Sequence, residues 1–178
     1  MGYTAASIVL VLAAGLAMGR LLKSDGQTSF LITVGTAICG GSAIAAVAPV
    51  IQGRSASTSV ALGVVFALNA LALLLFPVIG HMADLSQSQF GLWSALAIHD
   101  TSSVVGAGMI YGAEALQIGT TVKLARALWI IPLVLAVSYI YHRYHKGDHD
   151  GQPVKRRYPW FILGFLAVAA LVTWVPAL

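Results

Sequence analysis

The sequence predicts an all-α membrane protein, a polytopic helical bundle of about six hydrophobic segments, and three observations support this fold class. Hydrophobic residues make up 58% of the 178 residues and charged residues only 9%, whereas about a quarter of the residues of a soluble domain are charged. The apolar runs are rich in Ala, Leu, Val and Gly and lack the alternation that marks a barrel strand. Each run also approaches the ~20 residues with which a helix crosses a bilayer.

The segments form a single transmembrane domain over residues 1–178. The first ends at Arg20 and Lys23 and has no basic stretch before it, so we expect a spanning helix rather than a cleaved signal peptide. The third holds Asn69 at mid-span, the fifth contains Pro132, and the sixth follows Pro159. The segments cover residues 4–22, 30–51, 58–80, 90–112, 121–141 and 160–175, and residues 142–158 form a polar linker.

The orientation follows from the basic residues of the connections. The linker carries a cluster of them: Arg143, Lys146, Lys155, Arg156 and Arg157. The positive-inside rule therefore predicts a cytoplasmic linker. If all six segments span, both termini lie outside and the short connection at residues 81–88 is also cytoplasmic. If the second or the fourth segment is re-entrant, the number of membrane crossings changes by one. Full spans and re-entrant segments both stay open.

Several function classes are disfavoured. The net charge of +4 lies mostly in connections, so it reports topology and does not indicate a nucleic-acid partner. A triad of Cys39, His99 and Asp100 is weak support for hydrolysis, so we expect no enzyme. We expect no cofactor and no metal site, because the polar, Gly-containing linker reads as solvated. Its histidines and aspartates are His142, His145, Asp148, His149 and Asp150.

The second segment carries glycines at its centre, in the run GTAICGGSA at residues 35–43. Gly-Gly costs ~1 kcal/mol per residue in a helix. A break there would place the amides of residues 42–44 at the start of a half-helix, which suits an anion. We therefore predict a discontinuous helix and a substrate-binding group made of Thr36, Cys39, Gly40, Gly41 and Ser42. The alternatives are close helix packing for the glycines and a plain packing role for the cysteine.

The fourth segment carries His99 and Asp100 at its centre, followed by the hydroxyl residues Thr101, Ser102 and Ser103. Ionisable groups at the midplane are costly and mark functional sites. We predict that His99 and Asp100 couple transport to protons or sodium, and that the hydroxyls contribute to binding. Adjacent residues point about 100° apart on a helix, so both can face one cavity only if the helix unwinds. The alternative is a structural pair.

Lys123 and Arg126 are three residues apart and share one helical face. They could attract an anion or neutralise Asp100, or they could snorkel to the interface. Asn69 is expected to bond to a neighbouring helix, with a cavity-facing role as the alternative.

Three stretches resemble one family: GTAICGGSAIAAVAPVI at residues 35–51, FGLWSALAIHDTSSVVGAG at 90–108 and VKLARALWIIPLVL at 122–135. They resemble the YeiH-like sulfate exporters, which are bacterial inner-membrane proteins. The resemblance covers essentially the whole chain. It implies an inverted-repeat secondary transporter, with sulfate as substrate and with His99, Asp100, Lys123 and Arg126 at matching positions. Family members are longer at both ends, which implies that this chain is a fragment, the product of a split gene or a compact relative. A second copy in a homodimer could complete its site.

The sequence thus predicts a multi-pass protein of the bacterial inner membrane that transports a small inorganic or organic anion, coupled to protons or sodium. A second interpretation stays open: a non-transporting membrane subunit, or a fragment that needs a partner chain.

Overall fold

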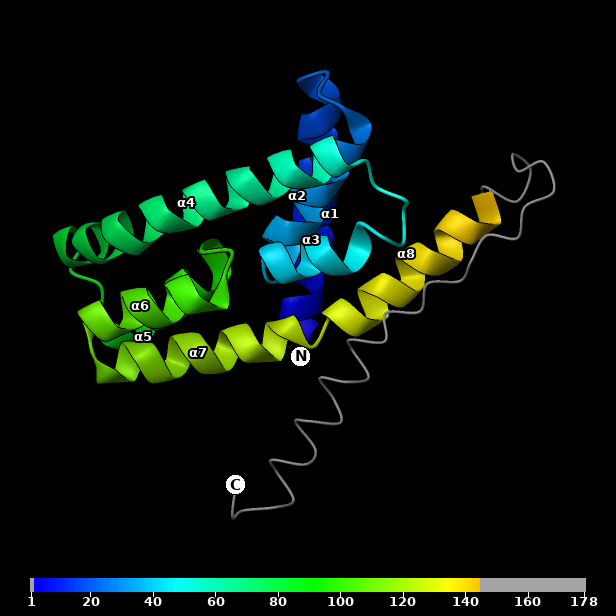
Figure 1. Ribbon diagram of the computed structural model, residues 1–178. Coiled ribbons are helices and arrows are strands. Elements are labelled where there is room, and N and C mark those ends of the chain that lie inside the picture. Colours follow the sequence, from blue (N-terminus) through cyan, green and yellow to red (C-terminus); the bar gives the residue numbers. More distant parts are fainter. Residues whose placement is uncertain (1, 145–178) are drawn as a thin grey trace, which may run out of the picture.

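The computed structural model describes residues 2–144, and the predicted sixth segment and the linker from residue 145 onward lie outside this part. All regular structure within it is helical (Figure 1). The helices are α1 (Gly2–Leu21), α2 (Gly26–Ala37), α3 (Gly41–Val47), α4 (Ser55–Met82), α5 (Gln87–Ala97), α6 (Thr101–Tyr111), α7 (Ala113–Ala127) and α8 (Ile130–Tyr144).

Three stretches are long and apolar enough to cross a membrane: Thr4–Leu21, Ser55–Met82 and Ala113–Arg143, the last formed by α7 and α8. They contain or overlap the first, third and fifth predicted segments. Large apolar side chains stay exposed along them, such as Leu10 at 68% and Leu74 at 68%. Such surfaces suit lipid, so the chain is a multi-pass membrane protein.

The second predicted segment turns back on itself. Asp25 caps α2 by accepting a hydrogen bond from the Thr28 amide at 2.9 Å, and its carboxylate also pairs with Arg54. The Arg54 amide donates to Gln27 Oε1 at 3.0 Å. Because Arg54 immediately precedes α4, the chain that leaves through α2 and α3 returns to the place where α2 began. We call residues 26–54 hairpin one.

The fourth predicted segment turns back in the same way. The Tyr111 hydroxyl donates to the Leu85 carbonyl at 2.5 Å, and the rings of Phe90 and Tyr111 stack with centroids 3.8 Å apart. Gln87 Oε1 accepts from the Glu114 amide at 3.0 Å. The start of α5 therefore lies beside the end of α6, and we call residues 86–112 hairpin two.

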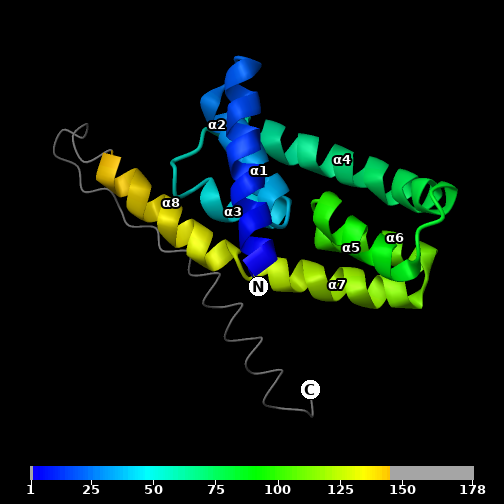
Figure 2. The same cartoon turned by 180° about the vertical axis from the view of Figure 1, so that it is seen from behind.

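The two hairpins start from opposite ends of α4. Hairpin one precedes α4 and hairpin two follows it, and the 28 residues of α4 span about 42 Å at 1.5 Å per residue. In the described structure, the second and fourth segments therefore return to their starting ends rather than running through. Seen from behind, α5, α6 and α7 lie side by side, while α1 stands beyond one end of them and runs roughly perpendicular to them (Figure 2).

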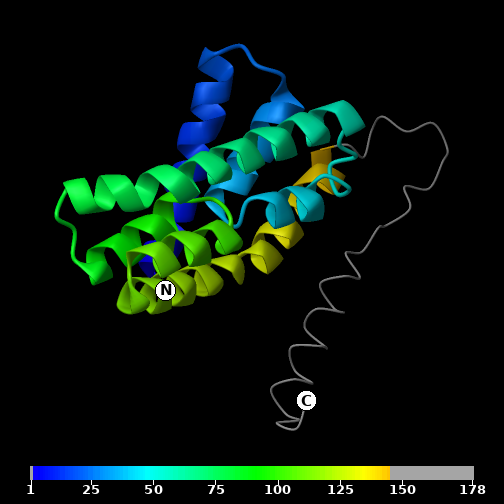
Figure 3. The same cartoon turned by 60° about the vertical axis from the view of Figure 1, so that its left-hand side comes forward.

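Each hairpin has its own apolar core. Around hairpin one, Leu31, Val34 and Ile44 are fully buried. Around hairpin two, Phe90 and Ala107 are fully buried. The view in Figure 3 shows α4 lying along both groups, so this helix connects the two cores.

Glycines allow the closest contacts between these helices. A β-carbon on Gly15 would lie 2.5 Å from Thr33 Oγ1, where α1 meets α2. One on Gly108 would lie 2.7 Å from Leu116 Cα, where α6 meets α7. Small residues at such crossings let helix backbones approach in a membrane.

Candidate functional site

The tip of hairpin one is a backbone turn. Helix α2 ends at Ala37, Gly40 donates its amide to the Gly35 carbonyl at 2.8 Å, and α3 begins at Gly41. Gly40 has φ +68° and ψ −125°, a conformation that residues with a β-carbon rarely adopt. The tip residues Ile38, Cys39 and Gly40 are all buried. Glycine is therefore required at this position by the backbone itself.

The tip of hairpin two is held by side chains. Helix α5 ends at Ala97, and Asp100 caps α6 by accepting from the Ser102 amide at 3.2 Å and from the Ser102 hydroxyl. Asn69, near the middle of α4, accepts from the His99 amide at 3.1 Å and from the Asp100 amide at 3.0 Å. A single amide oxygen thus replaces the helical carbonyls that these two amides lack.

The two tips touch. A β-carbon on Gly40 would lie 3.5 Å from the carbonyl carbon of His99 and 3.5 Å from the amide nitrogen of Asp100. The same atom would lie 3.2 Å from Cγ1 of Val65, one turn before Asn69 on α4. The structure therefore brings together the two interruptions that the sequence placed 60 residues apart.

Two buried cations bind the helix ends at these tips. Lys123 Nζ donates to the Ile98 carbonyl at 2.6 Å and, more weakly, to the Ala95 carbonyl at 3.4 Å. Arg126 donates from Nε to the Ala37 carbonyl at 2.9 Å and from Nη1 to the Leu96 carbonyl at 3.2 Å. These carbonyls are the negative dipole ends of α2 and α5, which a cation stabilises.

The interpretation that Lys123 and Arg126 snorkel to the interface is wrong. Both side chains are 1% exposed and lie at the middle of Ala113–Arg143. Their hydrogen-bond partners are backbone carbonyls, and the one ion pair within residues 2–144 joins Arg54 to Asp25. The crossing of the tips thus holds two cationic groups and one carboxylate.

Two polar atoms at the crossing lack partners. Asn69 Nδ2 and His99 Nδ1 are buried without a hydrogen bond, as is Thr120 Oγ1 on α7, in the described part of the chain. A buried donor left unpaired costs about 1–3 kcal/mol. The orientation of the Asn69 amide follows from chemistry, since its oxygen must face the two amide donors and its nitrogen is then the orphan.

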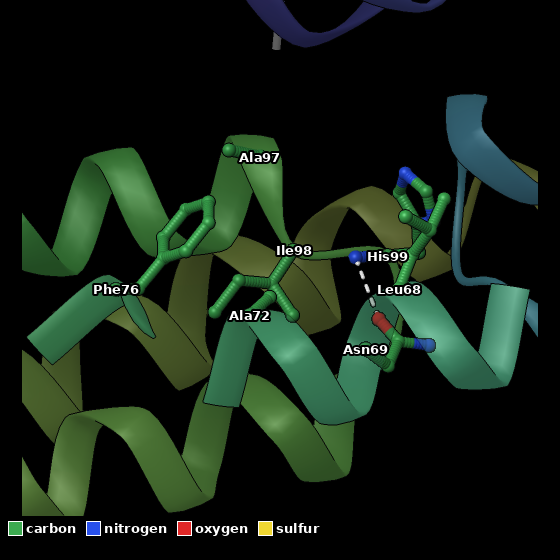
Figure 4. Close-up of a pocket in the computed structure, with 7 residues that line it drawn as sticks. All are labelled: Leu68, Asn69, Ala72, Phe76, Ala97, Ile98 and His99. Atoms are coloured by element: carbon green, nitrogen blue, oxygen red, sulfur yellow. Dashed lines mark hydrogen bonds between the residues drawn. The ribbon is translucent and has the colours of Figure 1, made fainter. Parts of the chain in front are cut away.

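A pocket of about 170 Å³ is lined in part by the residues Asn69 and His99 (Figure 4). Asn69 and His99 contribute to its lining at one end, and Phe76 lies at the other. The remaining lining residues are apolar: Leu68, Ala72, Ala97 and Ile98. The pocket is large enough for waters or a small ligand.

Residues 1–177 match the family described as conserved hypothetical protein 698. The chain belongs to this family. The family resemblance drawn from the sequence is thereby confirmed.

The family's curated relatives are bacterial UPF0324 membrane proteins. That of Bdellovibrio bacteriovorus is 62% identical over 177 residues, which are 99% of this chain and 54% of the relative. That of Geobacter sulfurreducens is 54% identical over 98% of this chain and 54% of the relative, and that of Shewanella oneidensis is 49% identical over 99% and 53%. The chain thus spans about half the length of the curated relatives it matches. No solved structure matches it. These relatives identify it as a multi-pass bacterial membrane protein.

The predicted site residues of hairpin one lie at or beside its tip, and Ser42 is exposed there. The Ser42 hydroxyl donates to the Cys39 carbonyl at 3.1 Å and to Cys39 Sγ at 2.9 Å, and Thr36 is partly buried. Gly41 packs against Phe66, whose Cζ would lie 3.0 Å from an added β-carbon. For Gly41, the packing alternative therefore describes the contacts.

In hairpin two, Thr101 and Ser103 are partly buried and Ser102 is exposed. The residue that the prediction left out of the site is Asn69, which the structure places between the tips. It is the only asparagine of the sequence and stands in the middle of an apolar segment. That isolation was the available signal, since a lone amide in hydrocarbon needs a partner.

Proposed function

We propose that this family member forms the substrate-binding core of a secondary transporter for a small anion. The observation that carries the proposal is the meeting of two hairpin tips, from opposite ends of α4, around buried cations. Interrupted helices that meet near the midplane are typical of transporter binding sites, because irregular backbone persists there only beside a cavity.

An inverted repeat would explain the order of the elements. Hairpin one is followed by the long helix α4, and hairpin two is followed by α7 and α8. The second pair begins at the opposite end of the molecule, which is the relation expected of an inverted-topology repeat. Whether the sixth segment continues this pattern lies outside the described residues.

The distribution of charge supports one orientation. Arg20, Lys23 and Arg54 lie at the end of the molecule where α4 begins, whereas Asp84 and Glu114 lie at the end where α4 stops. The positive-inside rule then places the arginine-rich end in the cytoplasm. This orientation moves the connection at residues 81–88 to the outer side, opposite to the expectation from six full spans.

The charge balance at the crossing favours an anion. Lys123 and Arg126 are buried on carbonyls, while the one carboxylate nearby, Asp100, already caps α6. The Asn69 nitrogen can only donate, and His99 Nδ1 donates in one of its tautomers. Sulfate is the substrate suggested by the family resemblance, and coupling to protons or sodium would fall to His99 and Asp100. The proposed role is transport without chemical conversion.

Transport assays on the purified full chain in proteoliposomes test this proposal. We expect saturable uptake of labelled sulfate, or of a competing small anion, that responds to an imposed proton or sodium gradient. Asp100→Asn should remove the response to the gradient while the protein still folds, and Asp84→Asn, on the connection after α4, is the matched control. Gradient dependence that survives Asp100→Asn would exclude Asp100 from coupling, and absence of anion uptake would contradict the transporter proposal.

A second candidate is a membrane subunit that needs a partner chain, with lipid and a second copy as its neighbours. It is favoured by the observation that the chain spans about half of its relatives. Sulfate binding by a homodimer but not by the monomer would show that a second copy completes the site. Anion uptake by a monomer would contradict this candidate.

A further inference from the structure

We infer that the pocket beside the tip of hairpin two is a binding site for one acyl chain of a bilayer lipid. This inference goes beyond the proposed function and does not depend on the anion. Three observations carry it. The accessible lining of the pocket is largely apolar, the pocket lies at the depth of the hydrocarbon core, and it adjoins the lipid-facing surface.

The polar atoms of the lining are engaged or turned away. The Asn69 oxygen accepts from two backbone amides, and Figure 4 shows the Asn69 nitrogen pointing away from the apolar lining. Asn69 Nδ2 and His99 Nδ1 each have less than 1 Å² of accessible surface. A hydrocarbon loses no hydrogen bond in such a pocket, whereas an ion would lose its hydration without replacement. The apolar lining residues are Leu68, Ala72, Phe76, Ala97 and Ile98.

The pocket lies at the depth of the lipid tails. Helix α4 begins at Ser55, so at 1.5 Å per residue Leu68 and Phe76 lie about 20 Å and about 32 Å along its length of about 42 Å. Both are thus about 10 Å or more from the ends of the helix, inside a hydrocarbon region about 30 Å thick. The medium around the protein at this depth consists of acyl chains.

The pocket also adjoins the surface that faces lipid. Leu68, one of its lining residues, is 46% exposed, and Leu71 and Leu75 on the same helix are exposed as well. On the α5 side, the lining residue Ala97 is exposed and its neighbour Leu96 is 48% exposed. The lining is therefore continuous with the apolar surface that contacts the bilayer, and a lipid tail can enter from the side.

The size of the pocket suits part of one acyl chain. An engineered apolar cavity of about 150 Å³ binds benzene. The pocket, at about 170 Å³, therefore accommodates a short stretch of hydrocarbon. At one end it reaches His99 at the tip of hairpin two, and at the other it reaches Phe76, whose ring stacks on Trp93 with centroids 4.2 Å apart. A bound tail would thus lie beside the tip and near Trp93.

Quenching of Trp93 by brominated lipid tests this inference. Trp93 is the only tryptophan left in the full chain after the replacements Trp129→Phe, Trp160→Phe and Trp174→Phe. The protein is reconstituted into vesicles of phosphatidylcholine with brominated acyl chains, and its fluorescence is compared with that in vesicles of unbrominated phosphatidylcholine. Because bromine quenches tryptophan only at short range, a tail in the pocket should quench Trp93 strongly.

Matched variants separate a tail in the pocket from the surrounding lipid. Ala72→Leu fills the pocket from α4 and Ala97→Leu fills it from α5, and each should remove most of the quenching of Trp93. Ala70→Leu, at an exposed position on α4 that does not line the pocket, should leave the quenching unchanged. Quenching that persists at full strength in both folded pocket variants would overturn the inference.

A second reporter reveals a different occupant. In a chain that carries Trp93→Phe and Leu74→Trp with the same three replacements, the only tryptophan stands at a position that is 68% exposed on α4, and surrounding lipid should quench it. If this reporter is quenched and Trp93 is not, a protein segment fills the pocket, either residues 160–175 or a second copy of the chain. That result would overturn the lipid assignment and leave the anion transporter proposal untouched.

Discussion

The tips of the two hairpins both form a turn between two helices, but by different means. Both interrupt a helix inside an apolar protein, and both leave backbone groups without helical partners. Hairpin one turns through the backbone, at a buried glycine with positive φ. Hairpin two turns with the help of side chains. Asn69 accepts from the amides at its tip, Asp100 caps the helix that follows the tip, and Lys123 donates to the carbonyls that precede it.

The two tips differ in the polar and charged side chains that they present. The glycine turn, residues 38–40, brings no charge, and none of its side-chain atoms is among the buried atoms without a partner in the described part of the chain. The polar turn holds the ionisable His99 and Asp100, and it carries one of the two orphan atoms, His99 Nδ1; the other, Asn69 Nδ2, lies on α4. Under the proposed function, hairpin two and Asn69 would carry the binding chemistry, and hairpin one would supply the small glycine turn that packs against them. Variants of each tip can break or sharpen this contrast.

The largest effect is expected for Arg126→Met, because Arg126 is the residue that binds both tips. Its loss leaves the Ala37 and Leu96 carbonyls without donors, and each buried unpaired group costs about 1–3 kcal/mol. We expect the thermal unfolding midpoint in detergent to fall by the equivalent of roughly 2–6 kcal/mol. Leu124→Met, at an exposed site on the same helix, is the control, and an equal midpoint for both variants would show that the bridge contributes nothing.

Asn69→Leu should come next. It removes the acceptor shared by two backbone amides, each worth about 1–3 kcal/mol when buried, with a partial offset because the orphan nitrogen also disappears. Hydrogen exchange should then increase at residues 98–101 and stay unchanged at residues 38–41. Equal changes at both tips would contradict the assignment of the Asn69 oxygen to the amides of hairpin two.

Gly40→Ala should lower the free energy of unfolding by about 1–3 kcal/mol. Alanine rarely adopts this backbone conformation, and its β-carbon would lie too close to Val65. Gly63→Ala is the matched control on α4, where no atom lies within 4 Å of an added β-carbon. The control should be neutral or slightly stabilising because alanine favours helix. A Gly40→Ala midpoint equal to that of the control would show that the turn does not depend on glycine.

The smallest effect concerns the base of hairpin one. The Thr28 amide, the Thr28 hydroxyl and the Arg54 guanidinium hold the pKa of Asp25 well below its usual range. Because the folded pKa is lowered, the stabilisation is present above the unfolded value of about 3.9 and is lost as pH falls through the folded value. The difference in midpoint between the natural chain and Asp25→Asn should therefore narrow from about pH 4 downward. A difference in unfolding midpoint that is constant between pH 6 and pH 2 would show that the ionised Asp25 carboxylate does not stabilise the fold.

The sequence predicted loosened helix near Gly40 and Asp100, and in the structure α2 ends at Ala37 and α5 at Ala97. It did not predict how the two segments turn. The return of each hairpin depends on contacts between distant residues, such as Arg54 with Asp25, which a run of suitable length and hydropathy does not reveal. The depth of Lys123 was also misjudged, because its partners are backbone carbonyls that carry no sequence signal.

Anion binding by Asn69→Asp tests the central claim most directly. The substitution keeps an oxygen for the His99 and Asp100 amides, so the fold should be retained, but it replaces the orphan donor with a negatively charged acceptor. Calorimetry with sulfate on the folded variant should show at least a tenfold loss of affinity relative to the natural chain. Unchanged anion affinity in the folded variant would show that the crossing of the tips is not the binding site.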